Sequence, residues 1–113
     1  MPTQVWNYPQ LPSVLYEGDT GYCVDYAKAL TGLSYKGNAI EWAKYINSKN
    51  PTLGSTVVFN IGRYGHLGVV VEIESDRFKI TERNYNGLFM VNERWVNNDD
   101  PSIMGYVDIN PLF

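Results

Sequence analysis

Two side chains of this sequence could act together as a nucleophile and its base. The chain has one cysteine, Cys23, and one histidine, His66. A lone cysteine is more often a small buried apolar residue, and a lone histidine is often a core residue bonded to backbone. Cys23, however, lies in the first turn of an expected helix, where the helix dipole and free N–H groups favour a thiolate. His66 follows Gly65 at the start of an apolar strand, at a loop edge from which a base could reach a thiol.

A carboxylate and an amide follow two residues apart, at Glu82 and Asn84. On an extended strand these two side chains share one face, together with Phe78 and Ile80. Solvation of the strand end would explain both polar groups. The alternative is functional: Glu82 would orient His66 through its second ring nitrogen, and Asn84 would be a further polar partner.

Aromatic residues make up 14% of the chain and could line a substrate groove beside these groups. Tyr64 is the best placed, because it lies two residues before His66 in a loop bounded by glycines. Tyr22 directly precedes Cys23, and Trp42 lies on a second expected helix. Aromatic side chains at such positions are usually core residues, so substrate binding is the less common alternative.

The elements that must position these residues follow from periodicity and turn signals. Residues 1–20 are loop-like, because prolines and a glycine interrupt any pattern. Two helices are expected next, over 22–30 with Asp19 or Thr20 as the cap and over 39–48. Strands are expected over 55–60, 66–74, 77–85, 88–95 and 103–109, with a tight hairpin at Asn86-Gly87. This order predicts an α+β fold in which N-terminal helices pack on an antiparallel sheet of five to six strands.

The catalytic hypothesis also constrains how strands 66–74 and 77–85 pair. A two-residue turn between them would pair His66 with Tyr85 and point Glu82 to the opposite face. Pairing Gly68 with Glu82 instead brings the polar groups to one face, with room for the imidazole over the glycine. We therefore expect an odd-length turn or a β-bulge near Glu74 to Arg77.

Six short blocks of the sequence are informative because of the order in which they occur. They are Gly21 to Ala27, Gly37 to Ala43, Pro51 to Ser55, Gly65 to Val70, Thr81 to Tyr85 and Ile103 to Val107. In this order they resemble the CHAP domains, the cysteine- and histidine-dependent amidohydrolases and peptidases. The resemblance implies a papain-like or NlpC-like fold and a single catalytic domain over residues 1–113. It also implies Cys23 as nucleophile, His66 as base, Glu82 as the residue that orients the base, and Asn84 as a further site residue.

Two departures from the family pattern concern the segment before the cysteine. Tyr22 stands where many members carry a glutamine that helps the oxyanion site, so the donor besides the Cys23 backbone N–H is not identified. Some members bind calcium through an Asp-x-Asp-x-Gly loop here. This chain has Glu17 and Asp19 at those positions, and we expect a solvated turn and no metal.

The resemblance implies a hydrolase that cuts an amide bond of bacterial peptidoglycan and needs no cofactor. It would be an N-acetylmuramoyl-L-alanine amidase or a peptide endopeptidase. Two alternatives stay open: an amidase acting on a small peptide conjugate such as a glutathione–polyamine amide, and a non-catalytic module that binds the cell wall.

Composition limits the partners and the location of such a protein. The net charge is −3 and no basic run occurs, which makes nucleic acid an unsuitable partner. No apolar stretch could span a membrane, and no signal peptide is visible. We expect extracellular or virion-associated action on the wall, with targeting by a phage virion or a separate wall-targeting domain.

Overall fold

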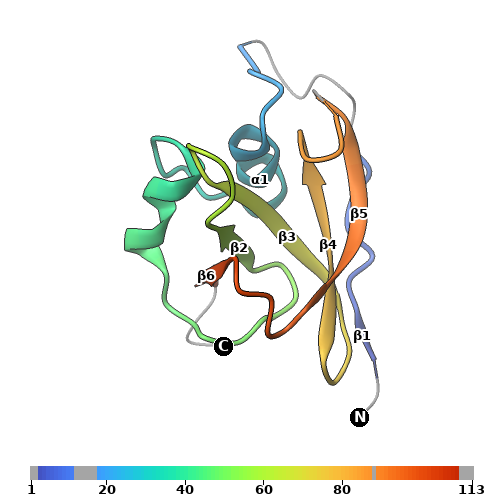
Figure 1. Cartoon of the computed structure of the whole chain (residues 1–113). Coiled ribbons are helices and arrows are strands. Elements are labelled where there is room, and N and C mark those ends of the chain that lie inside the picture. The colour runs from blue at the N-terminus through green and yellow to red at the C-terminus, as the bar shows by residue number, and fades with distance from the viewer. Residues whose placement is uncertain (1–2, 12–17, 88, 110–113) are drawn as a thin grey trace.

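The computed structural model describes residues 3–11, 18–87 and 89–109, and it has two helices packed on a six-stranded antiparallel sheet (Figure 1). The helices are α1 (Cys23–Thr31) and the 3-10 helix η1 (Ala39–Tyr45). The strands are β1 (Gln4–Val5), β2 (Thr56–Phe59), β3 (His66–Ile73), β4 (Arg77–Arg83), β5 (Val91–Asn97) and β6 (Ile103–Val107). This architecture confirms the predicted α+β fold.

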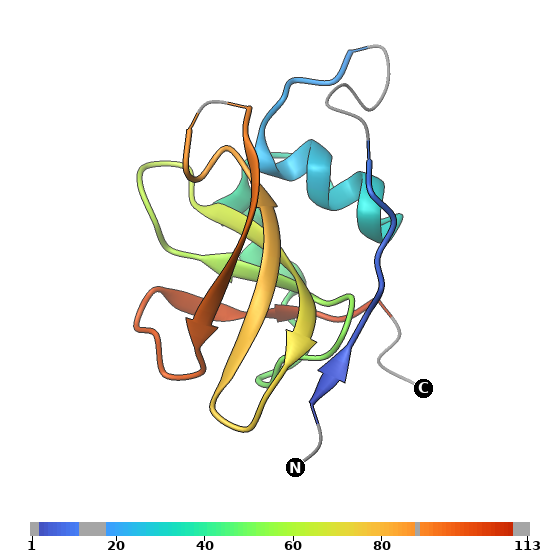
Figure 2. The same cartoon turned by 90° about the vertical axis from the view of Figure 1, so that its right-hand side faces the viewer.

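The sheet has the order β5-β4-β3-β2-β6, and β1 pairs with the far end of β3 (Figure 2). Each face of this sheet carries its own apolar cluster. Val58, Leu67 and Val69 pack against Ala27 of α1 and Trp42 of η1. Residues that alternate with these along the strands form the second cluster, which includes Val57, Val70, Phe78 and Ile80. None of the described helices combines the length and apolar character needed to cross a membrane.

In the first half of the chain, local structure differs from the sequence predictions at three places. Gln4–Val5 forms a short exposed strand within the segment predicted as loop, because its backbone groups pair with Ile73 and Glu72. Helix α1 begins after Tyr22, which makes no side-chain cap, instead of after Asp19 or Thr20. The second helix is 3-10 and ends at Tyr45, although Asn38 and Glu41 form a regular capping box at its start.

The β3–β4 hairpin contains the predicted register shift, but not in the turn. Beside the turn, Ile73 pairs with Phe78, as a two-residue connection requires. The register shifts between Val70 and Glu72, so that beyond this point Val69 pairs with Thr81. The bulge therefore lies inside β3 and not near the turn, but it changes the pairing register by one residue, as predicted. Gly68 makes room for Ile80, whose Cδ1 would lie 2.6 Å from an added Cβ, and not for the imidazole as we expected.

The predicted tight hairpin at Asn86-Gly87 is wrong. β4 ends at Arg83 and β5 begins at Val91, and the Asn84 N–H donates to the Met90 carbonyl across the base of the longer loop. A two-residue turn would have paired Glu82 with Val91, whereas the observed partner is Asn92. This difference of one residue decides which β5 side chains lie beside Glu82.

The loop before His66 depends on a glycine, and this gives a first prediction. Gly65 has φ +76 and an added Cβ would lie 2.6 Å from the Ile40 backbone nitrogen, whereas Gly62 in the same loop has φ +64 and open space around it. Gly62→Ala should lower the free energy of unfolding by about 1 kcal/mol through backbone strain alone. Gly65→Ala should lower it by roughly 3 kcal/mol, because η1 must also shift. Urea unfolding of both variants measures the difference, and equal losses would contradict the packing argument.

Candidate active site

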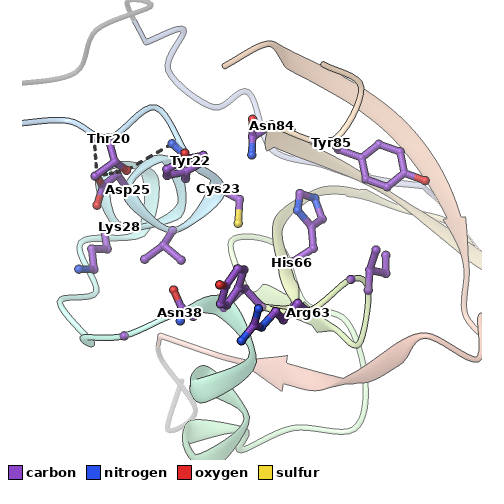
Figure 3. A pocket seen from close by; sticks show the side chains of 17 residues that line it. Thr20, Tyr22, Cys23, Asp25, Lys28, Asn38, Arg63, His66, Asn84 and Tyr85 are labelled. Carbon is purple, nitrogen blue, oxygen red and sulfur yellow. Dashed lines mark hydrogen bonds between the residues drawn. The ribbon is translucent and has the colours of Figure 1, made fainter. Parts of the chain in front are cut away.

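A pocket of about 710 Å³ opens at the N-terminus of α1 and contains both Cys23 and His66 (Figure 3). Its wall is formed by the start of α1, the segment before η1, the loop before β3 and the residues that follow β4. Four segments that are far apart in the sequence thus meet around the cysteine and the histidine. This is the place where the sequence predicted chemistry.

Cys23 is the first residue of α1 and is 8% exposed. Gly21 has φ +80, which allows the chain to turn sharply into the helix. In Figure 3 the Cys23 side chain and the His66 ring lie next to each other, and both line the pocket. Cys23 therefore lies at the positive end of the α1 dipole, beside His66.

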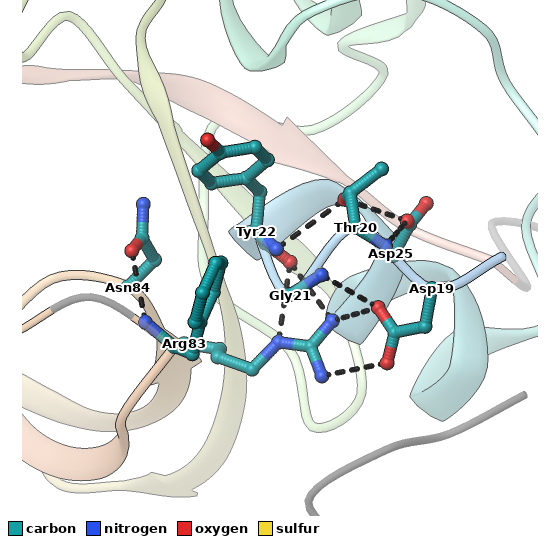
Figure 4. A network of polar contacts seen from close by, with 8 residues as sticks. Asp19, Thr20, Gly21, Tyr22, Asp25, Arg83 and Asn84 are labelled. Atoms are coloured by element: carbon teal, nitrogen blue, oxygen red, sulfur yellow. Dashed lines mark hydrogen bonds and ion pairs between the residues drawn. The ribbon is translucent and has the colours of Figure 1, made fainter.

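The segment before Cys23 is fixed by a buried ion pair between Asp19 and Arg83 (Figure 4). The two Nη groups of Arg83 donate to the two Asp19 oxygens over 2.6 and 3.0 Å. Arg83 also donates to the Tyr22 carbonyl, from Nε over 3.3 Å and from Nη2 over 3.2 Å. Tyr22, the residue directly before Cys23, is thereby held at the end of β4.

This ion pair bears on the expectation about metal. Both oxygens of Asp19 are engaged by Arg83, so a cation would have to compete with a guanidinium. Glu17 lies outside the described residues. Within the described ranges, no group of three or more His, Cys, Asp or Glu side chains is arranged to hold a metal ion.

His66 and Glu82 meet on the sheet face that points away from α1. His66 Nε2 and Glu82 Oε1 are 2.7 Å apart, and the two side chains are 7% and 0% exposed. The second ring nitrogen, Nδ1, is left for the thiol. Burial lowers the pKa of His66, but hydrogen bonding to Cys23 and to the Glu82 carboxylate outweighs it and raises the pKa from 6.5 to about 9.

Two residues that the sequence analysis missed hold the other oxygen of Glu82. Asn92 Nδ2 donates to Glu82 Oε2 over 2.9 Å and Arg94 Nε donates to it over 2.7 Å. The Arg94 guanidinium also lies 3.9 Å from the centre of the Tyr85 ring. Asn92 and Arg94 are two residues apart on β5, which indicates that they share a face. This spacing identifies them as partners of Glu82 only once the β4–β5 register is known.

Asn84 lines the pocket but does not continue the strand as expected. β4 ends at Arg83, and Asn84 has φ +73, outside the extended region. Its Oδ1 accepts from the Phe89 N–H over 3.1 Å. In Figure 3 its side chain lies above Cys23 and His66, with the amide nitrogen on the pocket side.

The three aromatic candidates for substrate binding separate into two groups. Tyr22 and Tyr64 line the pocket and are 49% and 56% exposed. Trp42 is fully buried, with its ring edge-on to that of Tyr35 in the core. The expectation that Trp42 contacts substrate is therefore wrong, because its side chain has no surface to offer.

The raised pKa of His66 gives a second prediction, which is simple to test because the chain has a single histidine. The imidazole C–H resonances should titrate with a midpoint near pH 9. Glu82→Gln and Cys23→Ala should each lower this midpoint toward 6.5, because each removes a partner of the imidazolium. NMR titration of the three proteins decides it, and a midpoint near 6.5 in the parent protein would contradict the ion pair.

The same proton has a consequence for stability. Below about pH 6.5 the folded and unfolded chains both hold it, whereas between about 6.5 and 9 only the folded chain does. The contribution of His66 to the free energy of unfolding is thus fully present below pH 6.5. It is lost as the pH rises through about 9, which pH-dependent urea unfolding should show relative to His66→Gln.

Comparison with known proteins agrees with this fold and its motifs. The sequence model of the CHAP domain matches residues 15–86. The fold is similar to that of an N-acetylmuramoyl-L-alanine amidase from Staphylococcus aureus, with a TM-score of 0.66 and 24% identity over 81% of this chain and 32% of that one. It is also similar to Ly7917, with a TM-score of 0.59 and 16% identity over 77% of this chain and 52% of that one.

This chain therefore spans about a third and about half of the lengths of these two structures. At these identities the likeness shows a shared fold. The family match covers well over half of the sequence and includes the blocks that contain Cys23, His66 and Glu82. The chain belongs to the CHAP domain family.

Proposed function

We propose that this chain is a peptidoglycan hydrolase that cleaves an amide bond by a cysteine mechanism. The observation that carries the proposal is the arrangement of Cys23, His66 and Glu82 one after another. Cys23 and His66 line the pocket, and Glu82 is buried behind His66, to which it is hydrogen-bonded. Membership in the CHAP family and the fold shared with the staphylococcal amidase support a hydrolase of the cell wall. The bond would be the N-acetylmuramoyl-L-alanine amide or a peptide bond of the stem or cross-bridge.

In the proposed first step the Cys23 thiolate attacks the carbonyl carbon of the scissile amide. A bond forms between sulfur and carbon, and the carbonyl oxygen takes the negative charge. As the carbon–nitrogen bond breaks, protonated His66 gives its Nδ1 proton to the leaving amine. The pKa of about 9 keeps His66 protonated at neutral pH, ready for this transfer.

In the second step, neutral His66 takes a proton from a water molecule, which attacks the thioester carbon. The carbon–sulfur bond then breaks, the carboxylic acid product leaves, and Cys23 and His66 return to their starting forms. Glu82 keeps Nε2 protonated and the ring oriented throughout, which fixes the tautomer in both steps. No organic cofactor takes part.

The oxyanion needs hydrogen-bond donors, and two groups are suitably placed. The Cys23 backbone N–H is at the start of α1, where helical N–H groups have no intrahelical partner. Asn84 supplies the second, because the Phe89 N–H occupies its Oδ1 and its amide nitrogen is on the pocket side. Tyr22 and Tyr64 would flank the substrate at the pocket rim.

The wall is the expected partner, reached from outside the cell or from a virion. We propose that targeting comes from a phage particle or from another module, because a net charge of −3 gives little attraction to an anionic wall.

A third prediction tests the mechanism directly. Cys23→Ala and His66→Ala should each lower the rate of wall hydrolysis by about a thousandfold or more while circular dichroism shows a folded protein. Release of fragments from purified walls, followed by mass spectrometry, measures the rate and identifies the bond. Turnover by either folded variant at a tenth of the parent rate would overturn the mechanism. Cleavage of small amides without release from walls would favour the small-conjugate amidase.

A fourth prediction concerns Arg94, which acts through Glu82 and is a positioning residue. Arg94→Gln should lower kcat about tenfold, because Glu82 loses a charge-assisted hydrogen bond and the imidazole loses its fixed direction. It should also raise the NMR midpoint of His66 above that of the parent, because a nearby positive charge is removed.

The matched control is Arg77→Gln. Arg77 also pairs with a carboxylate, Glu74, and lies 4.0 Å from the centre of the Trp95 ring, but it is outside the pocket. Arg94→Lys should recover part of the rate. An unchanged His66 midpoint in Arg94→Gln would reduce Arg94 to a structural role.

A further inference from the structure

The arginines of this chain differ in what their guanidinium groups contact. Three of the four form ion pairs: Arg77 with Glu74, Arg83 with Asp19 and Arg94 with Glu82. The fourth, Arg63, is exposed at the pocket and forms no ion pair with any described residue. Its guanidinium carbon lies 5.4 Å from the centre of the neighbouring Tyr64 ring. A guanidinium with an aromatic neighbour still has its edge N–H groups available for an anion.

A second cation lines the same pocket from the opposite wall. Lys28 is half-buried on α1 and, like Arg63, has no ion-pair partner among the described residues. The carboxylate of Asp25 also lines the pocket, but its Oδ2 already accepts from the Thr20 N–H over 2.9 Å and from the Thr20 hydroxyl over 2.7 Å. The described residues that line the pocket thus include two basic side chains, Arg63 and Lys28, and one carboxylate, Asp25. Basic groups outnumber acidic ones there, in a chain whose net charge is −3.

We propose that Arg63, supported by the charge of Lys28, binds a carboxylate of the stem peptide while an amide of that peptide is cleaved. This subsite rests on the proposed function and names the feature of the wall that the pocket recognises. Stem peptides carry free carboxylates a few bonds from their amide linkages, and a guanidinium can hold a carboxylate by two parallel hydrogen bonds. Arg63 lies three residues before His66, so an anchored carboxylate would also fix the distance between the scissile amide and the base.

The probes are three soluble muramoyl tetrapeptides that differ in one group. The first has a free glutamyl α-carboxylate and a free C-terminal carboxylate. The second has the glutamyl group as carboxamide, and the third has the C-terminal group as carboxamide. Calorimetric titration into the Cys23→Ala protein gives dissociation constants without turnover. We expect one of the two amidated probes to bind roughly fivefold more weakly than the first, the scale of one exposed charge pair.

The variants are made in the same Cys23→Ala background. Arg63→Gln should weaken binding of the probe with both carboxylates free and leave binding of the more weakly bound amidated probe unchanged, so that the preference disappears. Arg63→Lys should keep part of the preference. Lys28→Gln should weaken binding of the same probe by a smaller factor. Lys49→Gln removes an exposed positive charge outside the pocket and should change nothing, which controls for the net charge.

Failure of the subsite and failure of the proposed function give different results. Equal binding of all three probes by the parent, or an undiminished preference in Arg63→Gln, overturns the subsite whatever the enzyme cleaves. A preference that depends on Arg63, in a chain whose native Cys23 form releases nothing from walls, supports the subsite and overturns the hydrolase. Absence of binding by every probe overturns the stem peptide as ligand.

Discussion

The hydrogen-bonded pair of His66 and Glu82 is the constraint on which the rest of the site depends. The two atoms are 2.7 Å apart, and Glu82 is completely buried. A buried carboxylate without partners would destabilise the fold by several kcal/mol, so its partners must be in place. The bulge inside β3 brings the imidazole to the right face, and Asn92 and Arg94 satisfy the second oxygen. The pairing register of β3, β4 and β5 thus places the hydrogen-bond partners of a single carboxylate.

Strand β4 positions both His66 and the segment before Cys23. Consecutive side chains on a strand point to opposite faces, so Glu82 reaches His66 while Arg83 reaches the segment before α1. Arg83 holds Asp19 and the Tyr22 carbonyl, and Cys23 follows directly. Two adjacent residues, on opposite faces of the sheet, therefore hold His66 and the segment that leads into Cys23.

Two polar atoms beside Glu82 lack hydrogen-bond partners in the described part of the chain, which has a cost in stability. Around Glu82, Asn92 Oδ1 and Arg94 Nη2 are buried and have no hydrogen-bond partner among the described residues. Such atoms cost free energy that an apolar pair at the same positions would not. The same polar neighbours give the second oxygen of the buried Glu82 side chain its hydrogen bonds, which an apolar pair would leave unmade.

The sequence by itself determined the family, the α+β order of elements and the residue types of the site, because local signals suffice for these. Helix α1 ends at Thr31, one residue beyond the predicted end. The expectation that His66 and Glu82 share a face, which came from the catalytic hypothesis, predicted a β-bulge, and the two side chains do meet. Only the tertiary structure decided where the bulge lies, that the loop after Arg83 is long, and that Asn92 and Arg94 face Glu82. Strand register is non-local: a shift of one residue exchanges the two faces of a strand without changing its composition. Packing also decided the place of Trp42, a candidate for substrate binding, whose side chain η1 buries in the core against the sheet.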